Sequence, residues 1–368
     1  MSTIPFTRGV PGPSMLPVAD IKAAAVAALE QDPNAALAYG PGGYLPLREW
    51  VGERHGVDAS RVLLVNGSLQ GLTYIAQHLF LGSPGRALVE DPTYDRTLKV
   101  LRTFGASPSP VPVTDDGMDV DALERALGEG AKPALLYLIP TFQNPRGTTL
   151  PAEGRRRVVE LCREAGVLVL EDDPYGLLRF EGEPAPTLHQ LDGGDNVVYT
   201  SSFTKTIAPG VRTGYMILPE RLVKPMAVIS ENSCIGPNTF AEATLNAYCR
   251  AGRFEPNVER ATAMLRERRD AMSETLREHF PETARWREPQ GGYFTWVELS
   301  EDVDAGSLLD EATRRGVPYV KGADFSASGG CRSAVRLAFS YPEPDQIREG
   351  VARLGALFSE APAAAPVA

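Results

Sequence analysis

The sequence predicts an α/β fold in which helices flank a mostly parallel central sheet, with a smaller α+β domain added to it. From about residue 60, short apolar runs alternate with helical patterns, as in parallel sheets. Near residue 280 this alternation gives way to strands with a half-exposed pattern. With 368 residues, the chain is long enough for one large domain and a smaller, partly discontinuous one.

The elements of the large domain follow one another in the order that such a sheet requires. The expected strands are residues 61–65, 86–90, 134–139, 167–170, 196–200 and 214–218. The expected helices follow the Asn66-Gly67-Ser68 turn as far as Phe80, and then cover residues 94–104, 151–165 and 254–280. The helix over 151–165 has proline in its first turn and ends before Gly166, which are typical boundary signals.

The smaller domain is expected to contain strands at 293–299 and 334–341 and a closing helix at 345–359. We therefore divide the chain into an N-terminal segment (1–17), a small domain (18–42 and 281–360), a large domain (43–280) and a tail (361–368). The alanine- and proline-rich tail is of low complexity, and we expect it to be disordered.

Composition excludes several classes of function. A net charge of −10 argues against nucleic-acid binding, although a local pocket on an acidic protein can still attract an anion. No apolar run approaches the roughly 20 residues of a membrane span, and the first residues lack the layout of a secretory signal. The cysteines and histidines show no metal-ligand spacing, so we expect no metal site and a cytoplasmic protein with reduced thiols. The cysteines are Cys162, Cys234, Cys249 and Cys331, and the histidines are His55, His78, His189 and His279.

Polar and glycine-rich residues follow four of the predicted strands. They are Asn66-Gly67-Ser68, Asn144-Pro145, Asp172, and the run from Ser202 to Lys205. In open α/β sheets, ligands bind beyond the carboxyl ends of the strands. These four strand ends therefore predict one shared site.

The segment from Ser201 to Gly214 (SSFTKTIAPGVRTG) concentrates hydroxyl groups and cations. A lysine with a lowered pKa forms Schiff bases with aldehydes, and an arginine grips a phosphate with its planar fork. Lys205 and Arg212 would supply these groups, with Ser202 as a hydroxyl donor. Taken alone, the Ser-x-x-Lys pattern is more typical of a surface loop with a solvated lysine.

The run from Ser202 to Tyr215 resembles the lysine motif of the class I/II aminotransferases, within the fold type I superfamily of pyridoxal-phosphate (PLP) enzymes. The resemblance covers nearly the whole chain and is strongest to the branch of 2-aminoadipate and kynurenine aminotransferases, which also includes the aminotransferase-like domains of bacterial regulators. It implies that Lys205 holds PLP as a Schiff base and later moves the proton between Cα and C4′. It also implies that Arg212 and Ser202 hold the cofactor phosphate.

Further motifs carry the same resemblance. Gly67-Ser68-Leu69 lies at a strand–turn–helix start that offers an anion nest, and it resembles the phosphate loop of the family, although Leu69 replaces a polar residue. Glu171-Asp-Asp-Pro-Tyr175 resembles the segment whose first aspartate, here Asp172, keeps the ring nitrogen protonated. Without the other motifs, these would be an ordinary βα turn and a solvent-facing strand end.

In the same way, the resemblance assigns Tyr175 and Asn144 to the phenolic oxygen of the cofactor. The Asn144-Pro145 pair, taken alone, indicates only a turn. Tyr94 of the Asp91-Pro-Thr-Tyr segment would stack on the pyridine ring.

Arg336 lies inside an apolar strand, where burial of its charge is costly unless an anion compensates it. By position it matches the arginine that binds the substrate α-carboxylate, with an interior salt bridge as the alternative. Gly9 and Val10 belong to a segment resembling the one that covers the substrate. Tyr39 aligns with a tyrosine that enters the phosphate site of a neighbouring subunit, so we expect a homodimer with shared active sites.

These expectations describe a PLP-dependent aminotransferase that moves an amino group between an L-amino acid and a 2-oxo acid. The same residues activate Cα without dictating which bond breaks, so β- or γ-elimination, replacement, decarboxylation or oxidation is the alternative. A non-catalytic sensor domain is a further alternative, which the early start of the Gly9 segment and the full set of cofactor residues disfavour. For a distal carboxylate, Arg8 and Arg146 are the arginines to consider.

Overall fold

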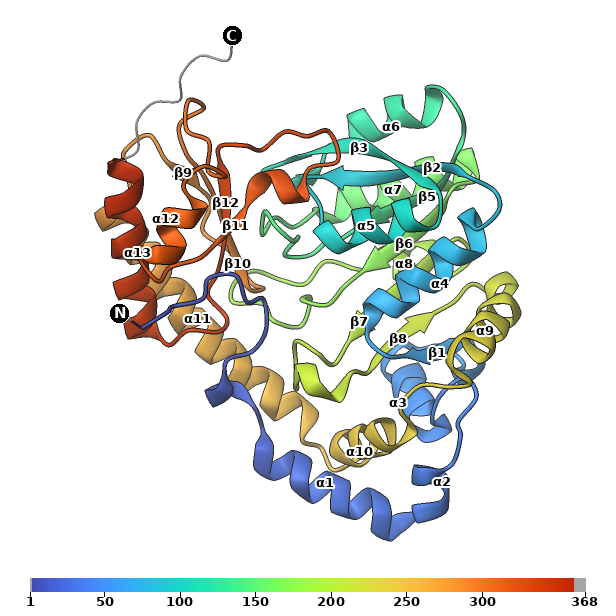
Figure 1. Cartoon of the computed structure of the whole chain (residues 1–368). Helices are drawn as coiled ribbons and strands as arrows, with labels where there is room; N and C mark the ends of the chain where they lie inside the picture. The colour runs from blue at the N-terminus through green and yellow to red at the C-terminus, as the bar shows by residue number, and fades with distance from the viewer. Residues whose placement is uncertain (1, 361–368) are drawn as a thin grey trace.

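The computed structural model describes residues 2–360, and the predicted disordered tail at 361–368 lies outside them. Two sheets organise this part of the chain (Figure 1). The large sheet has eight strands in the spatial order β1 (Val62–Val65), β8 (Gly214–Ile217), β7 (Val197–Ser202), β6 (Leu168–Asp172), β5 (Pro133–Leu138), β2 (Gly85–Asp91), β3 (Ala106–Thr114) and β4 (Gly117–Met118). Its central strands β7, β6, β5, β2 and β3 are parallel, whereas β8 runs antiparallel to both neighbours. The predicted mostly parallel sheet is confirmed.

Helices cover both faces of the large sheet. Alternate residues of β5 point to opposite faces, so that Leu135 and Tyr137 join one core cluster while Leu136 and Leu138 join another. The first cluster includes side chains of α4 (Ser68–Phe80) and α5 (Asp95–Thr103). The second is covered by α6 (Val120–Gly128), α7 (Ala152–Ala165) and α8 (Leu188–Asp192). Because both faces of these strands are buried, the strands are continuous apolar runs in the sequence and could be predicted from it.

A smaller antiparallel sheet lies beyond the large one, as expected. Its order is β11 (Val320–Lys321), β12 (Ala334–Ala338), β10 (Phe294–Glu298) and β9 (Arg285–Trp286). The long helix α11 (Phe254–His279) runs from the large sheet to this region, where it packs against α13 (Pro344–Ser359), with α12 (Leu309–Arg314) on the same side (Figure 1). The strands expected at 293–299 and 334–341 and the helix expected at 345–359 correspond to β10, β12 and α13.

The first helices pack differently from the expected domain division. Helix α1 (Val18–Gln31) and α2 (Pro33–Leu37) lie against α10 (Thr239–Arg250), which also contacts α3 (Leu45–His55), at the bottom of the view and away from α13 (Figure 1). Helix α9 (Glu220–Cys234) packs against α4. Ala24, Ala28 and Ala36 join the core cluster that contains Leu47 and Val51. Small alanine side chains permit this close approach, so residues 18–42 pack with the large sheet and not with residues 281–360.

The segment before α1 does reach the small sheet. The Ala338 N–H donates to the Phe6 carbonyl at 2.9 Å, and the Gly12 N–H donates to the Ser340 carbonyl at 3.0 Å. Residues 4–12 therefore cross from the small sheet toward the edge of the large one.

Strand β3 was not predicted from the sequence. Pro108, Pro110 and Pro112 occupy alternate positions of this strand, and proline lacks the N–H that a ladder requires. Successive N–H groups of a strand point to opposite edges, so three alternate prolines remove donors from one edge only. On the edge that faces away from β2, strand β3 pairs only with the two-residue strand β4, at Val113 and Thr114. The prolines are therefore compatible with the parallel ladder to β2.

Candidate active site

The carboxyl ends of the central strands open into a cavity of about 310 Å³. Strands β1, β5, β6 and β7 all end at this edge, because the two antiparallel steps through β8 return β1 to the direction of β7. Twelve of the fourteen residues predicted from the sequence line this cavity: Gly9, Gly67, Ser68, Leu69, Tyr94, Asn144, Asp172, Tyr175, Ser202, Lys205, Arg212 and Arg336. The structure thus contains one shared site at the strand ends.

Two predicted residues lie elsewhere. Val10 does not line the cavity, and its carbonyl accepts a hydrogen bond from Ser340 Oγ at 2.9 Å. The Tyr39 side chain is 81% exposed and lies beside Leu37 and Phe240 in a separate surface hollow. A role for Tyr39 in a neighbouring subunit stays a prediction.

The Lys205 amine is on the cavity wall. Its Nζ donates to the Gly9 carbonyl at 2.5 Å and lies 5.5 Å from the centre of the Tyr293 ring. Burial lowers the pKa of Lys205 to about 8, with a smaller contribution from the positive charge of Arg336 and an opposing one from Asp172. A lysine with this pKa supplies free amine near neutral pH, as a nucleophile or a proton acceptor must.

Asp172 faces the same cavity from the end of β6. The Tyr137 hydroxyl donates to Asp172 Oδ2 at 2.8 Å, while Oδ1 is buried and has no hydrogen-bond partner among residues 2–360. Burial raises the pKa of Asp172 to about 7, and the Tyr137 hydrogen bond opposes that rise. A buried carboxylate oxygen without a partner is costly, which indicates that a donor on a bound molecule completes it.

An anion cradle lies at the start of α4. Gly67 has a φ of +90°, which favours glycine, and a Cβ at this position would displace the guanidinium of Arg212. Arg212 Nη2 donates to the Asn66 carbonyl at 2.8 Å, which holds its guanidinium beside the first N–H groups of the helix. Ser68, Ser202 and Thr204 add hydroxyl groups to the same wall. Helix N–H groups together with an arginine and hydroxyls suit a phosphate.

Arg336 enters the cavity from β12 of the small sheet. Its Nη1 donates to Asn144 Oδ1 at 2.9 Å, and its guanidinium stacks 4.2 Å from the centre of the Phe294 ring. Burial lowers the pKa of Arg336 to about 10, so it stays protonated at neutral pH. Among residues 2–360 it forms no salt bridge, and its Nε has no hydrogen-bond partner. The interior salt bridge that we considered as an alternative is therefore not present in the described chain.

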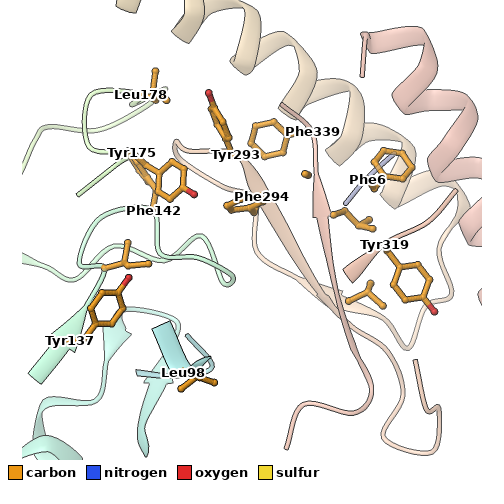
Figure 2. Packing of buried hydrophobic residues seen from close by; sticks show 14 of the residues in the cluster. Phe6, Leu98, Tyr137, Phe142, Tyr175, Leu178, Tyr293, Phe294, Tyr319 and Phe339 are labelled. Atoms are coloured by element: carbon orange, nitrogen blue, oxygen red, sulfur yellow. The ribbon is translucent and has the colours of Figure 1, made fainter. Parts of the chain in front are cut away.

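Aromatic rings join the two sheets at the cavity floor. Tyr175 stands edge-on to Phe294 with ring centres 5.7 Å apart, and 5.5 Å from Tyr293 (Figure 2). Burial raises the pKa of the Tyr175 phenol, so it stays protonated and is a hydrogen-bond donor. In the same view Tyr137 projects from its strand in the large sheet. These contacts fix the position of the Lys205 side of the cavity relative to the Arg336 side.

Sequence reasoning missed several residues of the site. Thr7, Asp95, Arg96, Ile139, Pro174, Thr204 and Phe294 line the cavity, and Tyr137 supports Asp172 from behind. Thr204 stands within the lysine motif, and Arg96 follows Tyr94 by two positions, so proximity to recognised motifs was an available signal for both. Thr7 and Phe294 carried no such signal.

The groups around the cavity define a class of protein. A lysine amine, a buried carboxylate oxygen without a partner among residues 2–360 and a phosphate cradle, all at the carboxyl edge of this sheet, fit PLP bound in a fold type I enzyme. Amine, ring-nitrogen partner and anion site are each supplied by residues that the structure places around one cavity.

Comparison with known proteins identifies the family. Residues 11–354 match the family model for aminotransferase class I and II. The chain is 33% identical to aromatic-amino-acid aminotransferase 1 of Thermococcus litoralis, over 97% of this chain and 88% of that protein. The chain belongs to the class I and II aminotransferases.

Solved structures agree with this assignment. The kynurenine aminotransferase of Pyrococcus horikoshii, solved in complex with pyridoxamine phosphate, matches with a TM-score of 0.93 and 34% identity, over 98% of this chain and 91% of that one. The α-aminoadipate aminotransferase of Thermus thermophilus, complexed with a phosphopyridoxyl-leucine adduct, matches with a TM-score of 0.92 and 32% identity, over 97% and 92%. The protein is a PLP-dependent aminotransferase of fold type I.

Proposed function

We propose that Lys205, Asp172, Tyr175 and Arg336 carry out amino transfer between an L-amino acid and a 2-oxo acid in this cavity. The observation that carries the proposal is the shared position of three groups around one cavity: the Lys205 amine, an Asp172 oxygen without a hydrogen-bond partner, and an Arg336 guanidinium without a carboxylate partner, both within residues 2–360. Together they offer a proton acceptor, a partner for a cationic ring nitrogen, and an anchor for a carboxylate.

When bound, PLP supplies an aldehyde that combines with amines and a ring that withdraws electrons from the substrate Cα. Asp172 Oδ1 would receive the ring N–H, and the negative charge would favour the protonated nitrogen. The phosphate would lie between Arg212 and the N-terminus of α4, with Ser68 and Ser202 as further donors. Tyr175 and the Asn144 Nδ2 group would donate to the phenolic oxygen, and Tyr94 would cover the ring.

Lys205 would hold the cofactor aldehyde in the resting enzyme and become a free amine when an amino acid takes its place. With a pKa lowered to about 8, it would then remove the Cα proton of the amino acid. The same amine would return that proton to the C4′ atom. Its Nζ lies 5.8 Å from the centre of the Tyr175 ring and 5.5 Å from that of Tyr293, so these two rings would border the path of the proton.

Arg336 would bind the substrate α-carboxylate, because its guanidinium is protonated, buried and without a carboxylate partner among the described residues. The hydrogen bond to Asn144 and the stacking on Phe294 fix the plane of the Arg336 guanidinium group. Gly9 brings the N-terminal segment over this position, since a Cβ there would lie 2.6 Å from Phe294 Cζ. Val10 would help to hold this segment in place, since its carbonyl accepts a hydrogen bond from Ser340 Oγ.

A half-reaction experiment tests this function. The purified PLP enzyme is mixed with individual L-amino acids without an oxo acid, and the products are quantified. Transamination yields one pyridoxamine phosphate and one 2-oxo acid per active site. Release of ammonia, or of a product with a broken C–C or C–S bond and unchanged PLP, would instead establish elimination, replacement or decarboxylation.

We further propose a homodimer in which Tyr39 completes the phosphate site of the partner subunit. Large exposed apolar side chains line the same surface hollow as Tyr39, namely Leu37 at 68% and Phe240 at 40% exposure. Such a cluster is typical of an interaction surface. We also propose a cytoplasmic location, in line with the free cysteines. Among the helices within residues 2–360, none has the length and apolar composition needed to cross a membrane.

Mixed dimers test the shared site. Chains carrying Lys205→Ala and chains carrying Tyr39→Ala are each impaired, but a mixed dimer contains one site with Lys205 from one chain and Tyr39 from the other. Recovery of activity on mixing supports a shared site. Activity that only averages the two parents, or a monomer in light scattering, contradicts it.

A further inference from the structure

We propose that Asp91 is a positioning residue for substrate binding. It ties the loop that carries Tyr94 to the segment that supports Arg336, and it thereby sets where the substrate α-carboxylate lies relative to the cofactor. Asp91 does not line the cavity, so it acts on the substrate only through Arg336. This inference rests on the proposed function, since it takes Arg336 as the anchor of the α-carboxylate.

Asp91 joins the two sheets by side-chain hydrogen bonds. It is the last residue of β2, and its carboxylate accepts from the segment that leads from the 3₁₀ helix η4 (Gly322–Phe325) to β12 of the small sheet. The Ala327 N–H donates to Oδ1 at 2.8 Å, and the Ser328 hydroxyl donates to Oδ2 at 2.5 Å. The Ser326 hydroxyl makes a longer contact with Oδ2, at 3.4 Å. Hydrogen bonds to a carboxylate are the stronger kind, so this one side chain is a firm connection.

The backbone adds a contact at the same junction. The Thr93 N–H donates to the Phe325 carbonyl at 2.9 Å. Thr93 is buried and directly precedes Tyr94, the residue that would cover the cofactor ring. Contacts at Asp91 and Thr93 therefore hold the loop that carries Tyr94 against the end of η4.

Phe325 connects this junction with Arg336. The Arg336 guanidinium lies 4.9 Å from the centre of the Phe325 ring and 4.2 Å from that of Phe294, so two rings support it. Phe325 is buried and also stands edge-on to Trp296, with ring centres 6.0 Å apart. Because protein interiors are closely packed, a displacement of η4 moves the Phe325 ring and with it the support of the guanidinium.

The other contacts of Arg336 do not replace this support. Its guanidinium donates to Asn144 Oδ1 at 2.9 Å and to the Thr7 carbonyl at 3.2 Å, and neither of these bonds fixes the Phe325 ring. Loss of Asp91 should therefore shift the guanidinium without releasing it. The expected result is weaker binding of every α-carboxylate, whatever the substrate side chain, with the cofactor still bound.

Calorimetry tests the proposal without turnover. The probe is 4-methylpentanoate, which is leucine without its amino group, and it is titrated into the PLP-loaded enzyme. In Asp91→Ala its dissociation constant should rise about 10-fold, because the hydrogen bonds that place the anchor are lost. Asp91→Asn, which keeps an oxygen for the Ala327 N–H, should show a smaller rise.

Steady-state kinetics give a second readout. In Asp91→Ala, KM for both leucine and alanine should rise by the same factor as the dissociation constant, with kcat within about 2-fold of wild type. The absorption of the bound cofactor should be unchanged. A double-mutant cycle isolates the contact itself, since Ser328→Ala should add no further rise once its partner Asp91 has been removed.

Asp119→Ala is the matched control. Asp119 Oδ1 also accepts a backbone N–H, that of Ala122 at 2.9 Å, but this contact caps helix α6 and does not reach the small sheet. Asp119 does not line the cavity either. Its loss should lower stability, as removal of a helix cap does, and leave the binding of 4-methylpentanoate unchanged.

Unchanged carboxylate binding in Asp91→Ala, or equal weakening in Asp119→Ala, would overturn the proposal. If Asp91→Ala does not fold, Asp91→Asn and Ser328→Ala replace it, and wild-type binding in both would have the same meaning. So would a rise in KM for leucine but not for alanine, because the α-carboxylate is common to both. A wild-type enzyme that forms no 2-oxo acid from any amino acid would instead overturn the proposed function itself.

Discussion

The two halves of the cavity are built in different ways. The half assigned to the cofactor consists of neighbouring strand ends of one sheet, where β6 brings Asp172 and β7 leads to Ser202 and Lys205. The half assigned to the substrate combines segments far apart in the chain, with Gly9 and Arg336 among their residues. A continuous sheet provides a rigid frame for chemistry that every substrate shares. Separate segments allow substrate recognition to vary without disturbing that frame.

Substitutions in the two halves should therefore have different kinetic effects. Changes in the cofactor half should reduce turnover of all amino acids alike. Changes in the substrate half should alter KM, or the choice of substrate, and leave bound cofactor in place.

The largest effect is expected for Lys205→Ala. Without the amine, the enzyme has neither the attachment point for the cofactor nor the proton acceptor, and kcat should fall by about 10⁴-fold or more with every amino acid. Initial rates with a panel of amino acids check this. Lys224→Ala, which removes an exposed lysine of α9, should behave as wild type. Near-normal turnover in Lys205→Ala would contradict the assignment.

Asp172→Ala should cost roughly 1000-fold in kcat while the cofactor stays bound. A neighbouring opposite charge shifts a pKa by about 1–3 units, and the ring nitrogen would lose that support. Activity is compared with the cofactor content of the same preparation. Asp172→Asn, which keeps the shape and removes the charge, should be similarly impaired. An active Asn variant would show that the charge is not needed.

Arg336→Ala, in the other half, should lower kcat/KM by roughly 10²- to 10⁴-fold for all amino acids. It would lose two charge-assisted hydrogen bonds, each worth about 1.5–3 kcal/mol. The loss should be mainly in KM, with the absorption of the bound cofactor unchanged. Arg146→Ala, whose arginine is salt-bridged outside the cavity, is the control. A loss of bound cofactor in Arg336→Ala would remove the distinction between the two halves.

Tyr137→Phe is expected to have the smallest effect, about 10-fold in kcat, as one hydrogen bond to Asp172 is lost. That hydrogen bond lowers the pKa of Asp172, so without it a higher pH is needed to ionise the carboxyl. The acidic limb of the pH profile of kcat should therefore move to higher pH.

Tyr199→Phe provides the control for this shift. It removes a comparable hydrogen bond, 2.9 Å long, to the adjacent Asp173, which does not line the cavity. Its pH profile should match that of the wild type. The same shift in both variants would mean that the effect is one of general stability.

The difference between the two halves also explains which residues of the site could be predicted from the sequence. Asp172 and Lys205 follow apolar strands of one parallel sheet, and such strands have their carboxyl ends at a common edge, so a sequence pattern is enough to group them. Tyr137 was missed because a tyrosine in an apolar strand is usually a packing residue, and its hydroxyl partner lies on another strand. The approach of Gly9 to Phe294 depends on how the small sheet meets the large one, which no local pattern records.

The packing of α1 was beyond sequence reasoning for a similar reason. Its alanines suit any close helix contact, and only the tertiary arrangement selects α10 as the partner. Strand β3 was missed because its alternate prolines, in a segment flanked by turn residues, indicate a loop unless the position of the strand in the sheet is known.

Peptide mapping tests the central claim most directly. The purified PLP enzyme is reduced with borohydride, which fixes the cofactor to the amine that holds it, and the digested protein is analysed by mass spectrometry. We predict one modified site per chain, at Lys205, and no such product after the enzyme has first been converted with an amino donor. A modification at another lysine, or no stoichiometric modification of the PLP-loaded enzyme, would contradict the account.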